Sequence, residues 1–204
     1  MDALKVYHYF ILLVFLAFNI VFSGCKVAMV QSDLMMSSRD FLKRGNDYLY
    51  LGQFEKAIKS YNKGIKQYKR GSPLFIATGK DSTYSKLYFY KGLAHYEMRK
   101  YKSAIRYFKK SIKSTPDSAK FHYYKGLASI ERGKYEEALE DFNKALAIDP
   151  KFASIYYQKG LIFEKQGKRK EALQAYNKFL DIIPSVRVEE ILEVNKRISD
   201  LGGG

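Results

Sequence analysis

The chain of 204 residues has one cysteine, three histidines and no tryptophan. A single cysteine, Cys25, excludes an intrachain disulfide, a zinc site built from several thiolates and a redox pair of cysteines. His8 lies in the apolar amino-terminal stretch, and His95 and His122 stand at helical positions that aromatic residues usually take. No pair of carboxylates and no nucleophile–base spacing stands out. We therefore expect no enzymatic activity, no cofactor and no metal site.

Acidic residues are also scarce. Asp and Glu number 21 against 36 Lys and Arg, which leaves a formal net charge of +15. Such a balance favours acidic partners, anionic lipid surfaces or nucleic acid, or it reflects only a lysine-rich solvated surface. Apolar material is plentiful, because 47% of the residues are hydrophobic and 16% are aromatic. This supply is ample for a packed interior.

A period of 34 residues runs through the chain after residue 85. Four landmarks keep it: Gly92, Gly126 and Gly160; Ala104, Ala138 and Ala172; Phe108, Phe142 and Tyr176; Pro116, Pro150 and Pro184. Glycine and alanine let two helices cross closely, and we expect the aromatic residues to fill the space between neighbouring hairpins. Proline stops each second helix. With these marks the period resembles the tetratricopeptide repeat, a helix-turn-helix unit, over roughly residues 38–186.

The resemblance implies an all-α fold, a right-handed superhelical solenoid of four helix-turn-helix units with a carboxy-terminal capping helix. The units span 38–71, 85–118, 119–152 and 153–186, and an inserted loop at 72–84 separates the first two. Residues 187–201 form the expected capping helix, because a stacked hairpin otherwise leaves an apolar face in water. Its apolar face would comprise Val188, Ile191, Leu192, Val194, Ile198 and Leu201. The alternative is a partner-binding or dimerising helix, and 202–204 form a tail.

The amino-terminal residues 1–24 are typical of a signal peptide. An apolar run over 10–22 follows Lys5, and it is shorter than the roughly 20 residues that a membrane-spanning helix needs. The run ends in Ser23-Gly24-Cys25, which resembles the lipobox of bacterial lipoproteins. That resemblance implies cleavage before Cys25, lipidation of its thiol, a tether over 25–37, and anchoring on the extracytoplasmic side of a bacterial envelope membrane. The alternative is an uncleaved anchor over 6–22 with Cys25 incidental.

In the tetratricopeptide family the first helix of each repeat lines a concave groove. Residues six before, three before, one after and four after the repeat glycine share one helical stripe. The expected groove residues are Arg39, Leu42, Asn46, Lys86, Phe89, Leu93, Tyr96, Lys120, Tyr123, Leu127, Ile130, Tyr157 and Leu161. This aromatic–aliphatic strip with a basic edge is typical of interaction sites. The alternative is that neighbouring first helices bury much of the strip against each other.

The second helices differ in charge. The second repeat has cations at Lys102, Arg106, Lys109, Lys110 and Lys113, whereas the third has Glu136, Glu137, Glu140 and Asp141. We expect solvated faces here, or, for the basic cluster, contact with anionic lipid headgroups.

We therefore predict a membrane-anchored scaffold that binds a protein or peptide partner, an envelope protein, in its groove. Lys86 and Lys120 would favour acidic segments. The alternatives are a basic surface that binds anionic lipid or another polyanion, and a non-catalytic subunit of an envelope-assembly complex, which rests on analogy alone. Neither nucleic acid nor metal is expected as a partner.

Overall fold

The computed structural model describes residues 36–70, 82–184 and 186–202. The expected signal peptide, Cys25, and most of the tether and of the inserted loop lie outside these ranges. The described helices are α2 (Ser38–Tyr50), α3 (Phe54–Arg70), α5 (Thr83–Glu97), α6 (Tyr101–Ser114), α7 (Ala119–Ile130), α8 (Tyr135–Ile148), α9 (Ala153–Lys165), α10 (Arg169–Ile182) and α11 (Val188–Asp200). Helix is the only regular structure in the described residues, which confirms the all-α prediction. None of these helices is long and apolar enough to cross a membrane.

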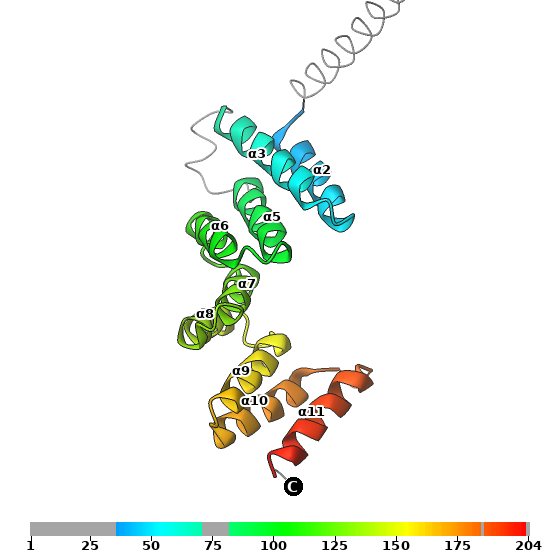
Figure 1. Cartoon of the computed structure of the whole chain (residues 1–204), viewed down its shortest axis with the longest axis vertical. Coiled ribbons are helices and arrows are strands. Elements are labelled where there is room, and N and C mark those ends of the chain that lie inside the picture. The colour runs from blue at the N-terminus through cyan, green and yellow to red at the C-terminus, as the bar shows by residue number, and fades with distance from the viewer. Residues whose placement is uncertain (1–35, 71–81, 185, 203–204) are drawn as a thin grey trace, which may run out of the picture.

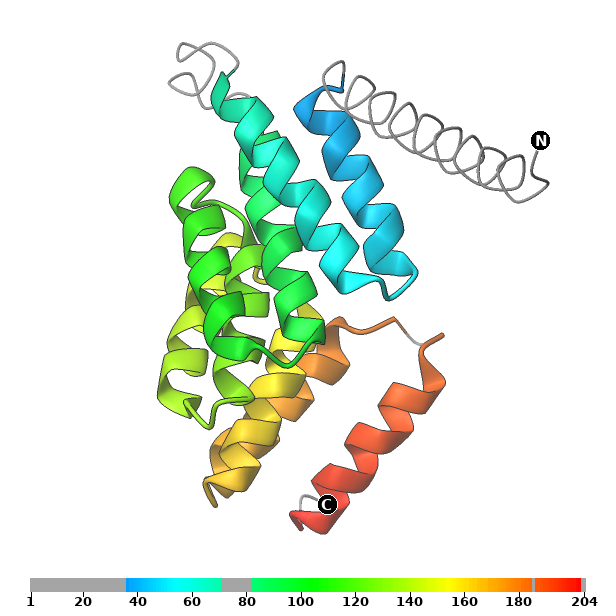
Figure 2. The same ribbon diagram turned by 45° about the horizontal axis from the view of Figure 1, so that its top comes forward.

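Within the described residues four antiparallel hairpins follow one another: α2–α3, α5–α6, α7–α8 and α9–α10. The stack curves into an open C, with α2 at one end and α11 at the other (Figure 1). In the turned view of Figure 2, the α2–α3 turn and the start of α11 lie on the same side of the stack. The curvature leaves one side of the molecule hollow.

Proline ends the second helix of three hairpins, as the sequence predicts. Helix α6 stops at Ser114, with Thr115 as its cap before Pro116. Helices α8 and α10 end in the same way, two residues before Pro150 and Pro184. The repeated helix length therefore follows from the repeated proline.

The repeat glycines let an aromatic ring of the same hairpin lie directly on the first helix. A Cβ atom placed on Gly126 would stand 2.5 Å from Cε1 of Phe142, and one on Gly160 would overlap the ring of Tyr176. Both rings are fully buried. The rings therefore do more than fill the space between neighbouring hairpins, because the missing glycine side chain also opens a seat for each ring within its own hairpin.

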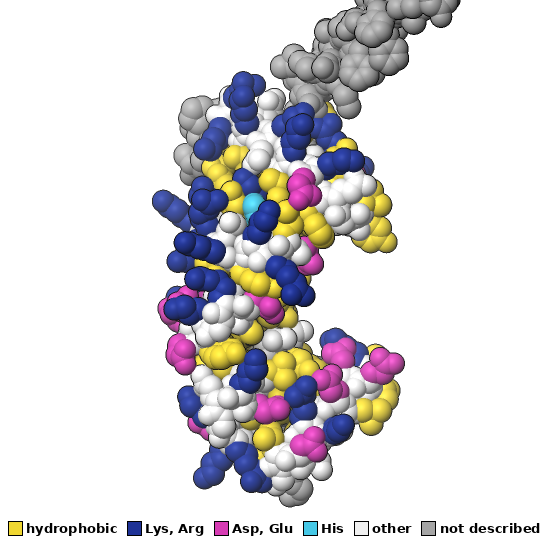
Figure 3. All heavy atoms as spheres, viewed as in Figure 1, with side chains coloured by type: hydrophobic (Ala, Val, Ile, Leu, Met, Phe, Trp, Pro, Cys, Tyr) yellow, Lys and Arg dark blue, Asp and Glu magenta, His cyan; other side chains and the backbone are white. Residues whose placement is uncertain are grey.

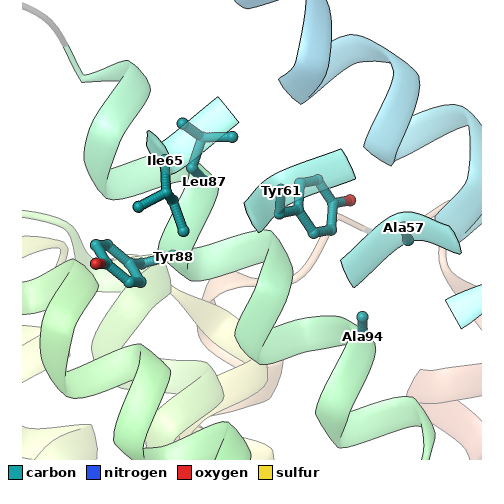
Figure 4. Close-up of a cluster of buried hydrophobic side chains, with 6 residues drawn as sticks. All are labelled: Ala57, Tyr61, Ile65, Leu87, Tyr88 and Ala94. Carbon is teal, nitrogen blue, oxygen red and sulfur yellow. The ribbon is translucent and has the colours of Figure 1, made fainter. Parts of the chain in front are cut away.

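The core is divided along the stack rather than concentrated at one centre. In one buried cluster, Ala57, Tyr61 and Ile65 of α3 meet Leu87, Tyr88 and Ala94 of α5 (Figure 4). Comparable clusters join α5 and α6 to α7, and α7 and α8 to α9. Each hairpin thus shares a buried cluster with the next one along the stack, as in other solenoids.

The first helix of the second repeat begins close to the predicted end of the inserted loop. Helix α5 begins at Thr83, two residues before the expected start of the second repeat. The Thr83 side chain is buried, and the Ser85 hydroxyl donates to the Ser82 carbonyl at 2.9 Å. Burial of this first turn extends the helix towards the loop.

Helix α11 covers the end of the stack with only part of its apolar face. Val194 is fully buried, and Ile191, Ile198 and Leu201 pack against α9 and α10. Val188 and Leu192 are instead exposed, Leu192 by 63%. The expected single face of six apolar residues is therefore divided between a packed side and an open side.

Candidate peptide-binding groove

Helices α2, α5 and α7, which carry most of the expected stripe, lie on the hollow side of the C (Figure 1). Figure 3 shows hydrophobic side chains across this concavity, with Lys and Arg concentrated over the upper half of the molecule. Three cations of the stripe, Arg39, Lys86 and Lys120, are exposed. The half-buried members are Leu42, Asn46, Leu93, Tyr96, Tyr123, Leu127, Ile130, Tyr157 and Leu161. Packing between neighbouring first helices therefore covers part of the stripe, and the remainder reaches solvent.

Phe89 is the stripe residue that the structure removes from the groove. Its side chain is 1% exposed. The ring stacks on Phe121 of α7 at 4.8 Å between centroids, and it also contacts Phe108 and Tyr124. The prediction that Phe89 anchors a partner was therefore wrong, because aromatic rings of α7 cover this side chain of α5. The Lys120 ammonium lies 5.4 Å from the centre of the Phe89 ring and marks the solvent edge of this contact.

Tyr96 and Tyr123 lie on α5 and α7 with rings that are only partly covered. Tyr123 packs on Phe152, with 4.8 Å between ring centroids, and Tyr96 meets Tyr101 edge-on at 5.5 Å. Burial raises the pKa of each phenol to about 12. Neither hydroxyl has a hydrogen-bond partner in the described part of the chain. Each tyrosine therefore offers a neutral donor beside an apolar ring surface.

Asn46 is held in place by the core beneath it. The Tyr61 hydroxyl donates to Asn46 Oδ1 at 3.0 Å, and Tyr61 is itself fully buried. Burial raises the pKa of Tyr61 well above its usual range, so this hydroxyl remains a donor. The orientation of the groove amide is thus set by a side chain that solvent does not reach.

Helix α11 covers the stripe of the fourth repeat. The Tyr157 hydroxyl donates to Glu193 Oε1 at 2.7 Å, and Leu161 packs in the same cluster as Val194. The guanidinium of Arg197 pairs with Glu164 at 3.2 Å. Tyr157 and Leu161 were expected to face a partner, but the capping helix packs against them in the partner's place. The open groove therefore belongs to the first three repeats.

Sequence reasoning missed two exposed apolar residues at the end of the first helix. Tyr50 is 93% exposed and Leu51 is also exposed, directly before the turn at Gly52. The stripe was counted only to four residues after the repeat glycine, and Tyr50 is five after Gly45. Their position directly before the turn glycine, where a helix end is usually polar, was the sequence signal for these exposed residues. They lie at the α2 end of the hollow.

Asp141 corrects the prediction of a solvated acidic face on α8. Glu136, Glu137 and Glu140 are exposed, but Asp141 is 2% exposed. Lys125 of α7 donates to Asp141 Oδ1 at 2.6 Å. One acidic residue of four thus joins two helices. The five cations predicted on α6 are all exposed, and two of them, Arg106 and Lys110, also border the Tyr107 ring.

Comparison with known proteins identifies the repeats. Models described as "TPR repeat" and "Tetratricopeptide repeat" match residues 126–167, and 42–69 with 153–186. A model described as "Anaphase-promoting complex, cyclosome, subunit 3" matches 74–145. No curated protein matches the chain.

Solved structures with a similar fold are numerous. A crystal structure of MamA matches with 26% identity and a TM-score of 0.61, covering 71% of this chain and 77% of that one. YrrB, titled as a TPR protein with an unusual peptide-binding site, matches with 19% identity and a TM-score of 0.61, covering 78% and 74%. A tetratricopeptide repeat protein from Parabacteroides merdae matches with 18% identity and a TM-score of 0.60, covering 71% of this chain and 53% of that one.

Proposed function

Because this chain contains tetratricopeptide repeats in one curved stack, we propose that it is a scaffold that binds an extended segment of a partner protein along the hollow face of repeats one to three. The observation that carries this proposal is the pair Tyr96 and Tyr123, whose partly covered rings lie on adjacent repeats. Leu93, Leu127 and Ile130 extend the same surface. Partly exposed aromatic rings of this kind commonly anchor interfaces.

The edge of the groove favours an acidic segment. Arg39, Lys86 and Lys120 are exposed along it, one on each of the three repeats. Charge complementarity at such a rim raises the association rate and selects among partners more than it raises affinity. The phenol hydroxyls of Tyr96 and Tyr123 are positioned to donate to backbone carbonyls of the bound segment.

The partner belongs to the bacterial envelope under the same proposal. Support comes from residues 1–25, whose apolar run and Ser23-Gly24-Cys25 end fit a lipoprotein signal and a lipidated Cys25. Helix α2 begins at Ser38, so at most about 45 Å of extended chain separates Cys25 from the first repeat, at roughly 3.3–3.6 Å per residue. The groove would then lie close to the extracytoplasmic face of a membrane.

Crosslinking in cells, followed by identification of the captured envelope proteins, tests both parts. We expect Tyr96→Ala/Tyr123→Ala to lose the captured partner, while Val188→Ala/Leu192→Ala, which also removes two apolar side chains outside the core, retains it. Circular dichroism of each variant checks that the helices persist. Lys86→Ala/Lys120→Ala, which touches only exposed residues, should weaken capture of acidic partners. Unchanged capture by both groove variants would rule the groove out.

A variant that lacks the lipidated thiol separates membrane anchoring from partner binding. In a Cys25→Ser variant labelling by radioactive palmitate should disappear, and capture of membrane-bound partners should fall because the scaffold is released. The groove itself is unchanged in this variant, so binding in extracts should persist. Palmitate labelling that continues after the substitution would contradict lipidation at Cys25 and leave the groove proposal standing.

A further inference from the structure

Three cations of α5 and α6 gather around one tyrosine ring of the second repeat, and none of them belongs to the groove residues. The Lys91 ammonium lies 4.2 Å from the centre of the Tyr107 ring, and the Arg106 guanidinium carbon lies 4.9 Å from it. The Lys110 ammonium lies 5.9 Å from the same centre and 5.3 Å from that of Tyr88. We call Lys91, Arg106, Lys110 and Tyr107 the Tyr107 cluster.

In the part of the chain that the structure describes, no carboxylate pairs with the cations of this cluster. Among the described residues, none of its three cations forms an ion pair. Helix α6 contains no Asp or Glu, and α3 and α5 contribute one each, Glu55 and Glu97. Three cations thus share one aromatic ring, and none of them has an anionic partner in the described ranges.

Lys91 makes the imbalance costly because it is buried. Its residue is 8% exposed, and its ammonium donates to the neutral amide oxygen of Asn62 at 2.5 Å. Buried charges are normally paired with an opposite charge, since removing an ammonium from water is expensive. The Tyr107 ring and one amide compensate only part of that loss. An anion beside Lys91 would supply the rest.

The same positive charges shift the pKa of neighbouring groups. Burial alone would raise the pKa of Tyr107, but Lys91 and Arg106 outweigh it and hold that pKa below its usual value. His95 stacks on Tyr107 at 5.0 Å, and burial, with Lys91, Lys100 and Arg106, lowers its pKa. The imidazole therefore remains neutral near pH 7 and adds no further charge. Its Nδ1 atom is buried without a hydrogen-bond partner in the described residues.

We propose that the Tyr107 cluster is a binding site for a phosphate-type oxyanion, supplied by an anionic lipid headgroup or by free phosphate. A guanidinium and two ammonium groups are the donors that proteins use for such oxyanions. Arg106 donates to the Tyr107 hydroxyl at 3.0 Å, which holds the guanidinium over the ring. The site uses none of the groove residues, so it stands apart from the proposed peptide binding.

The surface around the cluster fits a lipid headgroup as the source. Lys102, Lys109 and Lys113 belong to the same helix, and Figure 3 shows Lys and Arg gathered over this part of the stack. Each basic residue held near an anionic membrane contributes roughly 1 kcal/mol to binding. A small free anion would need only the three cations of the cluster.

The test follows the chemical reactivity of Lys110, which is exposed and belongs to the cluster. The full chain is placed in phosphatidylcholine nanodiscs, and acetylation of each lysine is followed by mass spectrometry. In one arm inorganic phosphate is added against sodium chloride of equal ionic strength. In the other arm phosphatidylglycerol replaces part of the phosphatidylcholine. We expect slower acetylation of Lys110 in at least one arm.

Two single-charge variants decide whether the protection is local. Arg106→Ala should weaken the apparent oxyanion affinity about tenfold or more, as the loss of a charge-assisted hydrogen bond does. Lys170→Ala removes the same charge from an exposed position on α10 and should leave Lys110 protected. Protection with phosphatidylglycerol alone identifies a lipid headgroup, and protection with inorganic phosphate identifies a free anion. No protection in either arm, or equal loss in both variants, would overturn the site.

Discussion

Lysine stands directly before the repeat glycine in the last three repeats, and two of these lysines reach back to the preceding hairpin. Lys91 donates to Asn62 at 2.5 Å, and Lys159 donates to Asn143 at 2.9 Å. Each asparagine directly follows the core aromatic residue of its own hairpin. The lysine stem covers apolar surface while its ammonium joins neighbouring repeats.

Lys125 departs from this pattern because of what precedes it. The corresponding residue of the preceding hairpin is Lys109, a like charge that would repel it. Lys125 pairs instead with Asp141 of its own hairpin, where Nζ and Oδ1 are 2.6 Å apart. Lys109 thus stands where the other two hairpins have the accepting asparagine, and the buried Asp141 serves as the acceptor for Lys125.

This pairing predicts a large effect from a single carboxylate. Asp141→Ala should lower the free energy of unfolding by about 3 kcal/mol, because it leaves the Lys125 ammonium largely buried and unpaired. Glu140→Ala is the matched control, since it removes an exposed carboxylate that pairs with Lys144 at 2.6 Å, and no measurable change is expected. Urea unfolding followed by circular dichroism measures both. Equal effects of the two substitutions would contradict the buried pair.

The hairpin turns share one backbone conformation although their residues differ. Gly52, Gly133 and Gly167 have φ angles of 68°, 70° and 69°, in the left-handed region. Arg99 takes the same place between α5 and α6 with φ of 57°. Because a side chain disfavours this region, the second hairpin carries backbone strain that the other three avoid.

Removing that strain should stabilise the protein. Arg99→Gly is expected to raise the free energy of unfolding by about 1 kcal/mol, since glycine adopts the left-handed conformation without a steric penalty. Gly133→Ala makes the reverse change, and because nothing lies within 4 Å of its added Cβ, it should cost about 1 kcal/mol through the backbone alone. Chemical denaturation of both variants provides the measurement. A loss of stability in Arg99→Gly would show that the arginine side chain contributes more than its backbone costs.

Tyrosine is the most frequent aromatic residue of the chain, and it contributes to the interior of the stack. The chain has 18 tyrosines and no tryptophan, and buried or half-buried phenols occur in every repeat. Burial raises the pKa of Tyr61, Tyr88 and Tyr176 above the usual range and that of Tyr96 and Tyr123 to about 12. The interiors between hairpins therefore hold neutral phenols that the unfolded chain would ionise near pH 10.

Stability should consequently fall in alkali. A phenol whose folded pKa is raised contributes fully below the unfolded value of about 10, and its contribution is lost as pH rises towards about 12. We expect the urea midpoint to be constant near neutral pH and to decrease over this interval. Tyr107, with its lowered pKa, should instead give the first phenol ionisation step in ultraviolet difference absorbance, and Tyr107→Phe should remove that step. A constant midpoint up to pH about 12 would contradict the raised values.

The repeat itself can be recognised from the sequence alone. Gly126, Phe142 and Pro150 recur at one period, and each acts within a single hairpin: a close helix contact, the ring that fills it, and a helix end. Such local rules repeat with the sequence, so the all-α stack and the turn glycines followed from it. Helical spacing alone also places the stripe residues on one side of each first helix, and their role as a groove stays a prediction.

The fate of each stripe residue depended on which helix lies opposite. Phe89 is buried because α7 closes over it, and Tyr157 contacts Glu193 because α11 returns along α9. Outside the stripe, Asp141 of α8 is buried beside Lys125 of α7. The Tyr107 cluster likewise needs α5 and α6 side by side. Periodicity in one chain cannot state these pairings, since they arise only when helices meet in space and their side chains compete for the same surface.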